Sequence, residues 1–295
     1  MLGVVNLDKP VGPTSHDMVG LMRRLTGIRR IGHAGTLDPL ASGVLPILVG
    51  AATRFSEELT GGRKRYEAVI RLGARSETDD AQGPITRVEA PMPDEATVRE
   101  GLRRFIGTFE QRPPTFSARK HEGRTAHRAA RAGDPIDVPP RQVTVESIAL
   151  VELRPADGML DALVDLRCGA GTYVRSIARD LGELLGCGGY LAGLRRTEAA
   201  GLRASEAVTP PVLQALAADG RLREALLPIG DLLPLASIEL SEEESRRFRH
   251  GSALTVAADA SGRVAVFEAG TLLGVGDLRA GTLRPDKVVP SEPAR

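Results

Sequence analysis

Residues 32–46 form the stretch that most constrains this chain, because they present one carboxylate, Asp38, in a loop punctuated by glycines. Glycine frees the backbone for positive φ angles or for close approach by another molecule, and Pro39 stiffens the step after the acid. A buried strand is expected directly afterwards, near 45–49. Spacing alone leaves two interpretations of the acid equally open: it caps a short helix that begins at Pro39, or it performs chemistry.

The length and composition indicate a globular protein with one large and one small domain. The chain has 295 residues, 42% hydrophobic and 26% charged, and this length is long for a single core. Cys168 and Cys187 form no CxxC motif, which suits a reducing cytosol, and the scattered histidines predict no zinc site. We expect neither a signal peptide nor a membrane span, because no apolar run has the necessary length, and therefore a cytoplasmic location.

Charge is unevenly distributed along the chain, although the formal net charge is only +1. Residues 1–66 carry nine Lys or Arg against five Asp or Glu, residues 119–131 carry five against one, and residues 76–100 carry seven acids against two bases. Such segregation can create a basic face that attracts phosphate backbones; an ordinary solvated surface is the alternative. The candidate phosphate contacts are Arg23, Arg24, Arg29, Arg30, Lys120, Arg124 and Arg128.

Apolar periodicity and capping residues predict helices and strands over most of the chain. Thr14 or Ser15 is expected to cap a helix that runs to Leu25, with Gly27 as its stop. Thr172 is expected to cap another helix that ends at Leu185. Residues 73–93 are polar and rich in turns. The remaining expected helices cover 51–60 and 94–105, and the expected strands cover 3–7, 45–49, 64–72, 143–153, 159–168 and 190–197.

Two segments depart from this pattern. Residues 111–141 hold five prolines and the second basic cluster, which is typical of a protruding loop, and a short helix is expected near 124–132. Residues 228–234 are expected to form a linker. Beyond it, a charged helix over 240–250 and four short strands with glycine turns predict a small β-barrel.

Five motifs in order along residues 1–235 resemble those of the TruB family of tRNA pseudouridine synthases. The loop 32–46 resembles the family signature, with Asp38 at the position of its catalytic aspartate. The others are NLDKPVGPTS at 6–15, KRY at 64–66, GTYVR at 171–175 and LRRT at 194–197. The resemblance implies an α+β fold. Its catalytic domain, over 1–232, has a central mixed, largely antiparallel sheet and a basic RNA-clamping insertion at about 111–141, and a small PUA-like RNA-binding β-barrel covers 236–292.

The resemblance also implies roles for individual residues. Asp38 is implied to act on the sugar, Tyr66 to stack on the base and serve as acid or base near C5, and Arg175 to form an ion pair with Asp38. An arginine in the first turn of a helix is otherwise mildly unfavourable, which favours the functional interpretation. The residues implied to bind the substrate are His33, Tyr173, Leu194, Lys9 and Asp80. His127 departs from the pattern, because the family often has a tyrosine there.

The reaction implied is isomerisation of uridine to pseudouridine at position 55, in the T loop of tRNA. The glycosidic bond must break and uracil must rejoin the sugar through C5, with nothing oxidised and nothing added, so neither a cofactor nor a metal is expected. The electron-poor sugar must be stabilised beside a carboxylate, as in glycoside hydrolysis. The uridine must also leave its stack, at a cost of a few kcal/mol. Asp38 can act as a nucleophile at C1′ or as a base at C2′, and the sequence leaves both open.

The implied partner is tRNA, bound through its T arm and acceptor region; no DNA, membrane or obligatory protein partner is expected. Three alternatives remain open. The same chemistry can act on another RNA, as in guide-dependent relatives. The chain can be a tRNA-folding or RNA-binding protein with dispensable catalysis. It can also be a DNA or nucleoside glycosidase, which would release free uracil.

The basic cluster generates a first prediction about salt dependence. If Lys120, Arg124 and Arg128 each neutralise one RNA phosphate, replacing all three with alanine should reduce the slope of log affinity against log salt by about 2 to 3. Filter binding of tRNA between 50 and 200 mM salt would measure this slope. An unchanged slope would show that the insertion does not clamp RNA.

Overall fold

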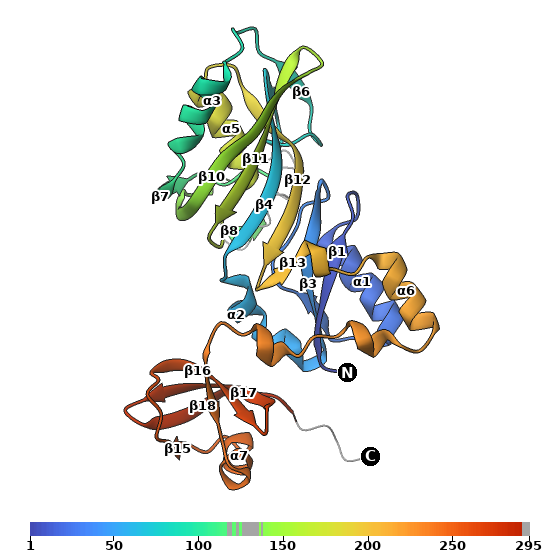
Figure 1. The fold of residues 1–295 in the computed structure, drawn as a ribbon, viewed down its shortest axis with the longest axis vertical. Helices are drawn as coiled ribbons and strands as arrows, with labels where there is room; N and C mark the ends of the chain where they lie inside the picture. The colour runs from blue at the N-terminus through green and yellow to red at the C-terminus, as the bar shows by residue number, and fades with distance from the viewer. Residues whose placement is uncertain (117–119, 122–123, 126–135, 137, 291–295) are drawn as a thin grey trace.

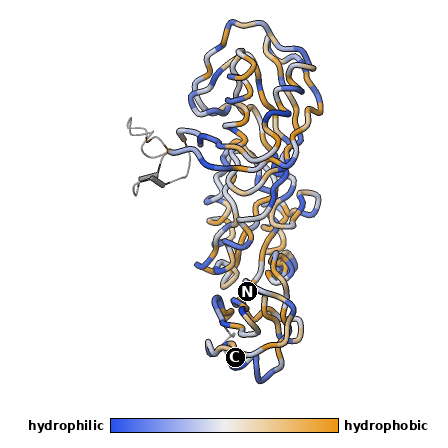
Figure 2. Tube along the Cα trace, turned by 90° about the vertical axis from the view of Figure 1, so that its left-hand side faces the viewer, coloured by the Kyte–Doolittle hydropathy of each residue, from blue (hydrophilic) through white to orange (hydrophobic). Residues whose placement is uncertain are grey.

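The computed structural model describes residues 1–116, 120–121, 124–125, 136 and 138–290 (Figure 1). These residues form one large sheet with its helices, a smaller sheet near the C-terminus, and two short hairpins. The N-terminus lies beside the smaller sheet in both Figure 1 and Figure 2. Short hydrophobic and hydrophilic stretches alternate along the chain in Figure 2. Within the described ranges, no helix is both long enough and apolar enough to cross a membrane.

The large sheet is mixed and largely antiparallel, which confirms the expected α+β class. Every strand pair in it is antiparallel except β12 with β3. Along its main path the sheet runs β1 (Gly3–Lys9), β3 (Ala41–Val49), β12 (Gly189–Ala199), β4 (Lys64–Leu72), β11 (Met159–Cys168), β10 (Arg141–Ala156) and β7 (Gly107–Gln111); β2 (Ile31–His33) pairs with β3, and β13 (Leu202–Arg203) with β12.

The core lies on one face of this sheet. Strand β4 alternates as predicted, so Tyr66, Ala68, Ile70 and Leu72 all point into the core. Four helices contribute the apolar side chains of the same buried cluster: α1 (Ser15–Thr26), α3 (Glu95–Arg103), α5 (Val174–Leu184) and α6 (Pro210–Ala218). Because Tyr66 points to this face, whatever site it belongs to lies on the helical side of the sheet.

Helix α1 follows the sequence prediction closely. The Thr14 hydroxyl accepts a hydrogen bond from the Asp17 backbone N–H, and the Asp17 carboxylate accepts one from the Thr14 N–H. This reciprocal capping box satisfies two donors that the first turn leaves unpaired. Gly27 ends the helix with a left-handed φ of 70°. The caps matter for the site, because they fix where the first residue of the helix, Ser15, lies.

The opposite face differs along the sheet: on β1 and β3 it buries Val4, Val44 and Leu48 in a second apolar cluster, whereas charged pairs lie on the neighbouring strands. Arg65 makes two hydrogen bonds to Asp165, and Arg71 makes two to Asp161 across β4 and β11. On β12, Arg195 pairs in the same bidentate way with Asp8 of β1. These cross-strand pairs satisfy the polar side chains that alternate with the core residues.

The smaller sheet holds β14 (Ala236–Glu239), β16 (Gly262–Glu268), β17 (Thr271–Arg279), β18 (Thr282–Val288) and β15 (Leu254–Thr255), in that order. Helix α7 (Glu242–Arg249) packs on it through Phe248. The preceding segment contains 3-10 turns at Ala204–Glu206, Leu222–Ala225 and Ile229–Leu232. The last of these buries Ile229, so residues 228–234 are packed rather than a bare linker.

The two sheets are joined by an apolar cluster and by ion pairs. Phe55 and Leu59 share the cluster with Ile229 and with Val275 of β17. The buried carboxylate of Glu58 binds both Lys287 (3.0 Å) and Arg263 (2.6 Å). Phe55 ends a 3-10 helix, Gly50–Phe55, and Glu58 lies in α2 (Ser56–Thr60).

Several sequence expectations need correction. The helix expected over 51–60 is divided because Phe55 leaves helical backbone angles (φ −101°, ψ 17°). Residues 73–93 are not all irregular, since β5 (Ala74–Ser76) and β6 (Ile85–Arg87) form a hairpin. Residues Arg124–Thr125 form strand β9, paired with β8 (Lys120–His121), instead of starting a helix. The remainder of that expected helix, residues 126–132, lies outside the described residues.

The junction generates a prediction about stability. Replacing the fully buried Phe55 with alanine should lower the free energy of unfolding by about 3–5 kcal/mol, because it removes apolar contacts on both sides of the junction and leaves a cavity. Urea unfolding measures this change. Val151→Ala is the control, since Val151 is 67% exposed and its truncation should change stability by no more than about 0.5 kcal/mol. Equal effects of the two variants would contradict the described packing.

Candidate active site

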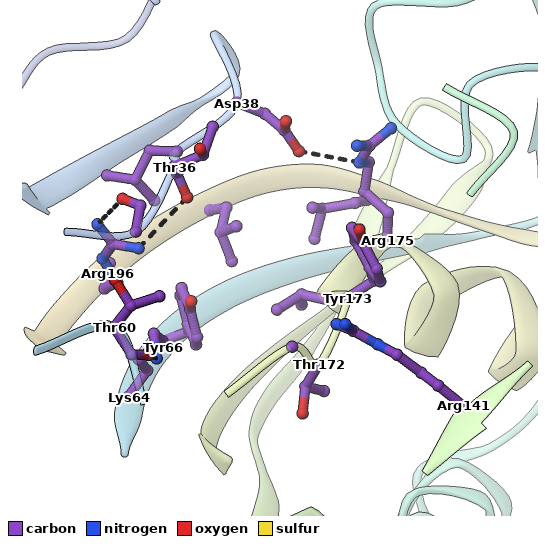
Figure 3. A pocket seen from close by; sticks show the side chains of 16 residues that line it. Thr36, Asp38, Thr60, Lys64, Tyr66, Arg141, Thr172, Tyr173, Arg175 and Arg196 are labelled. Atoms are coloured by element: carbon purple, nitrogen blue, oxygen red, sulfur yellow. Dashed lines mark hydrogen bonds and ion pairs between the residues drawn. The ribbon is translucent and has the colours of Figure 1, made fainter. Parts of the chain in front are cut away.

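A cavity of about 310 Å³ opens between the Asp38 loop, β4, β12 and the first turn of α5 (Figure 3). It lies on the helical side of the sheet, as the orientation of Tyr66 requires. The predicted site residues that line it are Asp38, Tyr66, Tyr173, Arg175 and Leu194. Three cationic residues that the sequence analysis did not single out also line it: Lys64, Arg141 and Arg196.

The Asp38 loop is held by the opening segment of the chain. The buried hydroxyl of Ser15 accepts a hydrogen bond from the Leu37 N–H (2.8 Å) and donates one to the Leu37 carbonyl (3.0 Å). The Gly12 N–H donates to the Pro39 carbonyl (2.8 Å). These contacts explain why two motifs that are separate in the sequence belong together: the first anchors the second.

Asp38 is not a helix cap. Its carbonyl accepts a hydrogen bond from the Ala41 N–H (3.0 Å), residues 39–40 form a turn, and β3 begins at Ala41. The helix-cap interpretation of the sequence was therefore wrong, because pairing of this segment with β1 draws it into the sheet. The carboxylate instead points into the cavity toward Arg175 (Figure 3).

Asp38 and Arg175 form an ion pair at the rim of the cavity. The Arg175 Nε lies 3.0 Å from Asp38 Oδ2, although its N–H is not directed at that oxygen, so the contact is electrostatic rather than a well-aligned hydrogen bond. The arginine side chain is only 6% exposed, whereas that of Asp38 is 39% exposed. The cation is thus fixed inside the protein and the carboxylate remains accessible from the cavity.

The rest of the Arg175 guanidinium is held by two carbonyls and a second acid. Nη1 donates to the Thr78 carbonyl (3.1 Å) and Nη2 to the Phe116 carbonyl (3.0 Å). The buried Asp80 lies 3.7 Å from Nη1 and accepts a hydrogen bond from the Thr78 hydroxyl (2.6 Å). Asp80 therefore acts behind Arg175 and does not line the cavity.

The turn that carries Asp80 is anchored by another ion pair. Asp79 has a left-handed φ of 60° and lies 2.8 Å from Arg179, one turn after Arg175 on α5. Burial raises the pKa of Asp79, an effect that the Arg179 cation opposes. Helix α5 thus holds the 78–80 turn at two points, and no pattern of neighbouring residues predicts these contacts.

Gln111 sets the start of α5, and the sequence analysis missed it. Its buried side chain accepts a hydrogen bond from the Tyr173 N–H (2.8 Å) and donates one to the Tyr173 carbonyl (3.1 Å). Thr172 is not the cap that we expected, because its hydroxyl donates to the Gly169 carbonyl (3.2 Å) and the helix begins after Tyr173. Nothing in the sequence around Gln111, the last residue of β7, predicts its contact with the Tyr173 backbone.

The walls of the cavity include two tyrosines. Tyr66 is buried, and burial raises its pKa, so the phenol holds its proton at neutral pH; the nearby Arg196 charge opposes this shift. The Tyr173 ring lies 5.2 Å from the guanidinium carbon of Arg141, within cation–π range. A Cβ on Gly171 would lie 2.2 Å from an Arg141 nitrogen, so glycine there gives the arginine room to reach the ring.

Lys9 and His33 lie outside the cavity lining. The Lys9 Nζ is buried and donates to the carbonyls of Pro10 (2.9 Å) and Ala41 (2.7 Å), so it supports the loop from behind. Burial lowers the pKa of Lys9 to about 8, which the Asp38 charge partly opposes. His33 ends β2, half-buried, with an Nδ1 that has no partner among the described groups, and burial lowers its pKa.

The four predicted phosphate contacts whose side chains are described do not line the cavity. Arg23, Arg24, Arg29 and Arg30 are exposed near the end of α1 and the start of β2. Arg30 donates to the Thr53 hydroxyl (2.7 Å), and Arg23 to the carbonyls of Arg29 and Ile31. For Lys120 and Arg124 only the backbone is described, and both Arg128 and His127 lie outside the described residues.

This arrangement can perform a defined kind of chemistry. A single accessible carboxylate faces a fixed cation, and the tyrosine rings and Leu194 offer surfaces to a planar group. Because the surrounding charged side chains that line the cavity are cations, it favours a ligand with negative charge or carbonyl acceptors. An accessible carboxylate can act as a nucleophile or as a base.

Comparison with known families gives a consistent result over nearly the whole chain. The N-terminal domain of the TruB family of pseudouridylate synthases matches residues 23–174, the C-terminal domain of tRNA pseudouridylate synthase B matches residues 175–234, and the C-terminal domain of pseudouridine synthase II TruB matches residues 236–289. The last match supports the PUA-like type of the small C-terminal domain.

Individual relatives and a solved structure agree with these family matches. The chain is 41% identical over 298 residues to tRNA pseudouridine synthase B of Cupriavidus taiwanensis, covering 97% of this chain and 94% of the relative. It is 43% identical over 281 residues to that of a Synechococcus species, covering 93% of each. The archaeal box H/ACA sRNP Nop10-Cbf5 complex contains a chain with a TM-score of 0.74 and 26% identity, covering 97% of this chain and 85% of that one.

The buried lysine generates a prediction about pH. The folded state holds the pKa of Lys9 near 8, below its ordinary value of 10.5, so between these values the unfolded state binds more protons and stability rises with pH. Relative to Lys9→Met, the intact protein should gain about 1–2 kcal/mol between pH 7.5 and 9.5 in urea unfolding. Lys287→Met is the control, because ion pairs raise that pKa and it does not titrate in this window. A flat difference for Lys9→Met would contradict its burial as a charged group.

Proposed function

This chain belongs to the TruB family of pseudouridylate synthases, and from that premise we propose that it is a tRNA pseudouridine synthase that converts uridine 55 in the T loop. The observation that carries the proposal is the Asp38–Arg175 ion pair at a cavity walled by Tyr66, Tyr173 and Leu194. The relatives named above supply the substrate class, since their names specify tRNA. Such a substrate implies a cytoplasmic site of action.

The proposed reaction needs no group beyond the chain and its RNA. The bond between N1 of uracil and C1′ of ribose breaks, a bond between C5 and C1′ forms, a proton leaves C5, and N1 gains one. Asp38 acts on the sugar, either by attacking C1′ and leaving it when C5 bonds there, or by removing a proton from C2′ and returning it when C5 joins C1′. In either case the carboxylate must be ionised, and the fixed Arg175 cation stabilises that form.

The cavity accepts the base only after it has left the RNA stack. Its volume of about 310 Å³ is near the lower end of small-ligand pockets, which suits one nucleotide rather than a paired segment. We propose that the ring of Tyr66 stacks on the uracil and that Tyr173 and Leu194 enclose it. The neutral Tyr66 phenol is a candidate to exchange a proton near C5 after glycosidic cleavage.

The remaining sequence-derived residues have supporting places in this proposal. Lys9 and Asp80 hold the Asp38 loop and Arg175, respectively. His33, at the end of β2, is proposed to occupy the gap that the extruded uridine leaves in the RNA. Arg29, Arg30 and the basic residues of the insertion would contact phosphates of the T arm, and the smaller C-terminal sheet would meet the acceptor region.

A single reconstitution tests the proposal. The purified chain alone is incubated with an unmodified tRNA transcript, and pseudouridine is mapped by chemical labelling and primer extension. We expect one pseudouridine, at position 55, and none when that uridine is replaced by cytidine. Product only in another RNA would favour the guide-dependent type of substrate, and free uracil would indicate a glycosidase. Binding without product would indicate an RNA-folding protein; each of these three results would overturn the proposal.

Removing the charge of Asp38 separates catalysis from binding. Asp38→Asn should form no detectable pseudouridine, because an amide is neither a nucleophile nor a base for this step, while tRNA affinity stays within about tenfold of the intact protein. Single-turnover assays measure the first quantity and filter binding the second. Asp219→Asn is the control: Asp219 is exposed at the end of α6 and should keep full activity. Normal turnover by Asp38→Asn would refute its role.

A further inference from the structure

Arg196 is a buried cation to which the function proposed above assigns no role. It lies on β12, is 1% exposed, and is among the largest fully buried side chains in the protein. Its hydrogen bonds go to backbone carbonyls: Nε to Val44 (2.7 Å), Nη2 to Gly35 (3.0 Å) and Nη1 to Thr36 (3.4 Å). Among the described residues, no carboxylate forms an ion pair with it.

Burying a guanidinium that no carboxylate pairs is energetically unfavourable. Removing such a charge from water is strongly unfavourable, and carbonyl hydrogen bonds offset this penalty only in part. An apolar side chain of similar size would pack at this point without that cost. The geometry of the three bonds therefore points to a task that an apolar residue cannot perform.

The carbonyls that Arg196 binds lie on both sides of Asp38. Gly35 and Thr36 immediately precede Leu37 and Asp38, whereas Val44 follows them on β3. One planar guanidinium therefore binds the loop at both of its ends. A lysine ammonium lacks donors in these fixed, separate directions. Figure 3 shows the guanidinium beneath the loop, with its bonds to the residues before Leu37 drawn as dashed lines.

The strand register places the same residue beside Tyr66. Arg196 pairs with Tyr66 across β12 and β4, and with Gly43 across β12 and β3. At Gly43 the φ is +100°, and a Cβ would lie 2.2 Å from the Arg196 carbonyl, so only glycine permits this approach. Burial raises the pKa of Tyr66, and the charge of Arg196 opposes that rise; burial lowers the pKa of Lys64, and the charge of Arg196 adds to that lowering.

We propose that Arg196 is a positioning residue for the isomerisation: its guanidinium sets the distance between the Asp38 carboxylate and the Tyr66 ring. The inference rests on the proposed function, since it concerns the same reaction. Asp38 must reach the sugar while Tyr66 holds the base, and the two side chains come from the loop before β3 and from strand β4. Arg196 binds backbone carbonyls on both sides of Asp38 and pairs with Tyr66 on the neighbouring strand.

Three variants test this inference in the full chain with unmodified tRNA. Arg196→Met keeps the length of the side chain and removes its donors, and Arg196→Lys keeps a charge without the planar fork. Arg195→Met is the matched control, because Arg195 is adjacent on β12 but faces the opposite side of the sheet, where it pairs with Asp8. Thermal unfolding first establishes the folded fraction of each variant.

The single-turnover rate constant with enzyme in excess and the Kd for tRNA are then measured separately. We expect Arg196→Met to lose about 100-fold in rate, the effect of a misplacement near 1 Å, with Kd changed less than about threefold. Arg196→Lys should lose at least tenfold even though it is milder for folding. Arg195→Met should match the intact protein in both quantities.

The outcomes separate the inference from the proposed function. A full rate in folded Arg196→Met or Arg196→Lys would overturn the positioning role while leaving the synthase activity established. A loss that appears only in stability or Kd would equally overturn it, since a packing or binding role predicts that result. If the intact protein and Arg195→Met form no pseudouridine at all, the proposed function itself fails.

Discussion

The ion pair between Asp38 and Arg175 is the interaction on which the site depends. The contacts around it position the arginine side chain and the loop that carries the aspartate. Arg175 is fixed by the carbonyls of Thr78 and Phe116 and is backed by Asp80. Within the described part of the chain, Asp38 has no comparable side-chain support, and its loop is held through the backbone. The result is a rigid cation and an accessible anion, which is the asymmetry that chemistry on an incoming sugar requires.

The order of strands explains how distant motifs meet. Strand β12 lies between β3, which follows the Asp38 loop, and β4, which carries Tyr66. Its parallel contact with β3 is the exception in an otherwise antiparallel sheet, and it brings Arg196 beneath the loop. Helix α5, which packs beside β12, then delivers Arg175 to the same cavity. The five motifs are therefore neighbours in space because one central strand is shared.

Much of this architecture could be predicted from the sequence, because the signals were local. The alternation of β4 and the caps of α1 follow from adjacent residues, and the family resemblance supplied the cavity residues Asp38, Tyr66 and Arg175. Contacts between distant segments could not be predicted in this way. Nothing near Gln111 indicates that it would bind the backbone of Tyr173, and Thr172 resembles a cap until Gly169 takes its hydroxyl. Pro39 likewise resembled a helix start, but pairing of the following segment with β1 overrode that preference.

The central claim is that the Asp38 carboxylate meets the sugar of an extruded uridine whose base lies against Tyr66. A crystal structure of the Asp38→Asn protein bound to a T-arm RNA tests it most directly, because this variant should hold uridine without converting it. The account predicts the residue-38 side chain about 3–3.5 Å from C1′ or C2′ of uridine 55, with the uracil stacked on the Tyr66 ring. A stacked, unextruded uridine, or a residue-38 side chain turned away from the sugar, would contradict it.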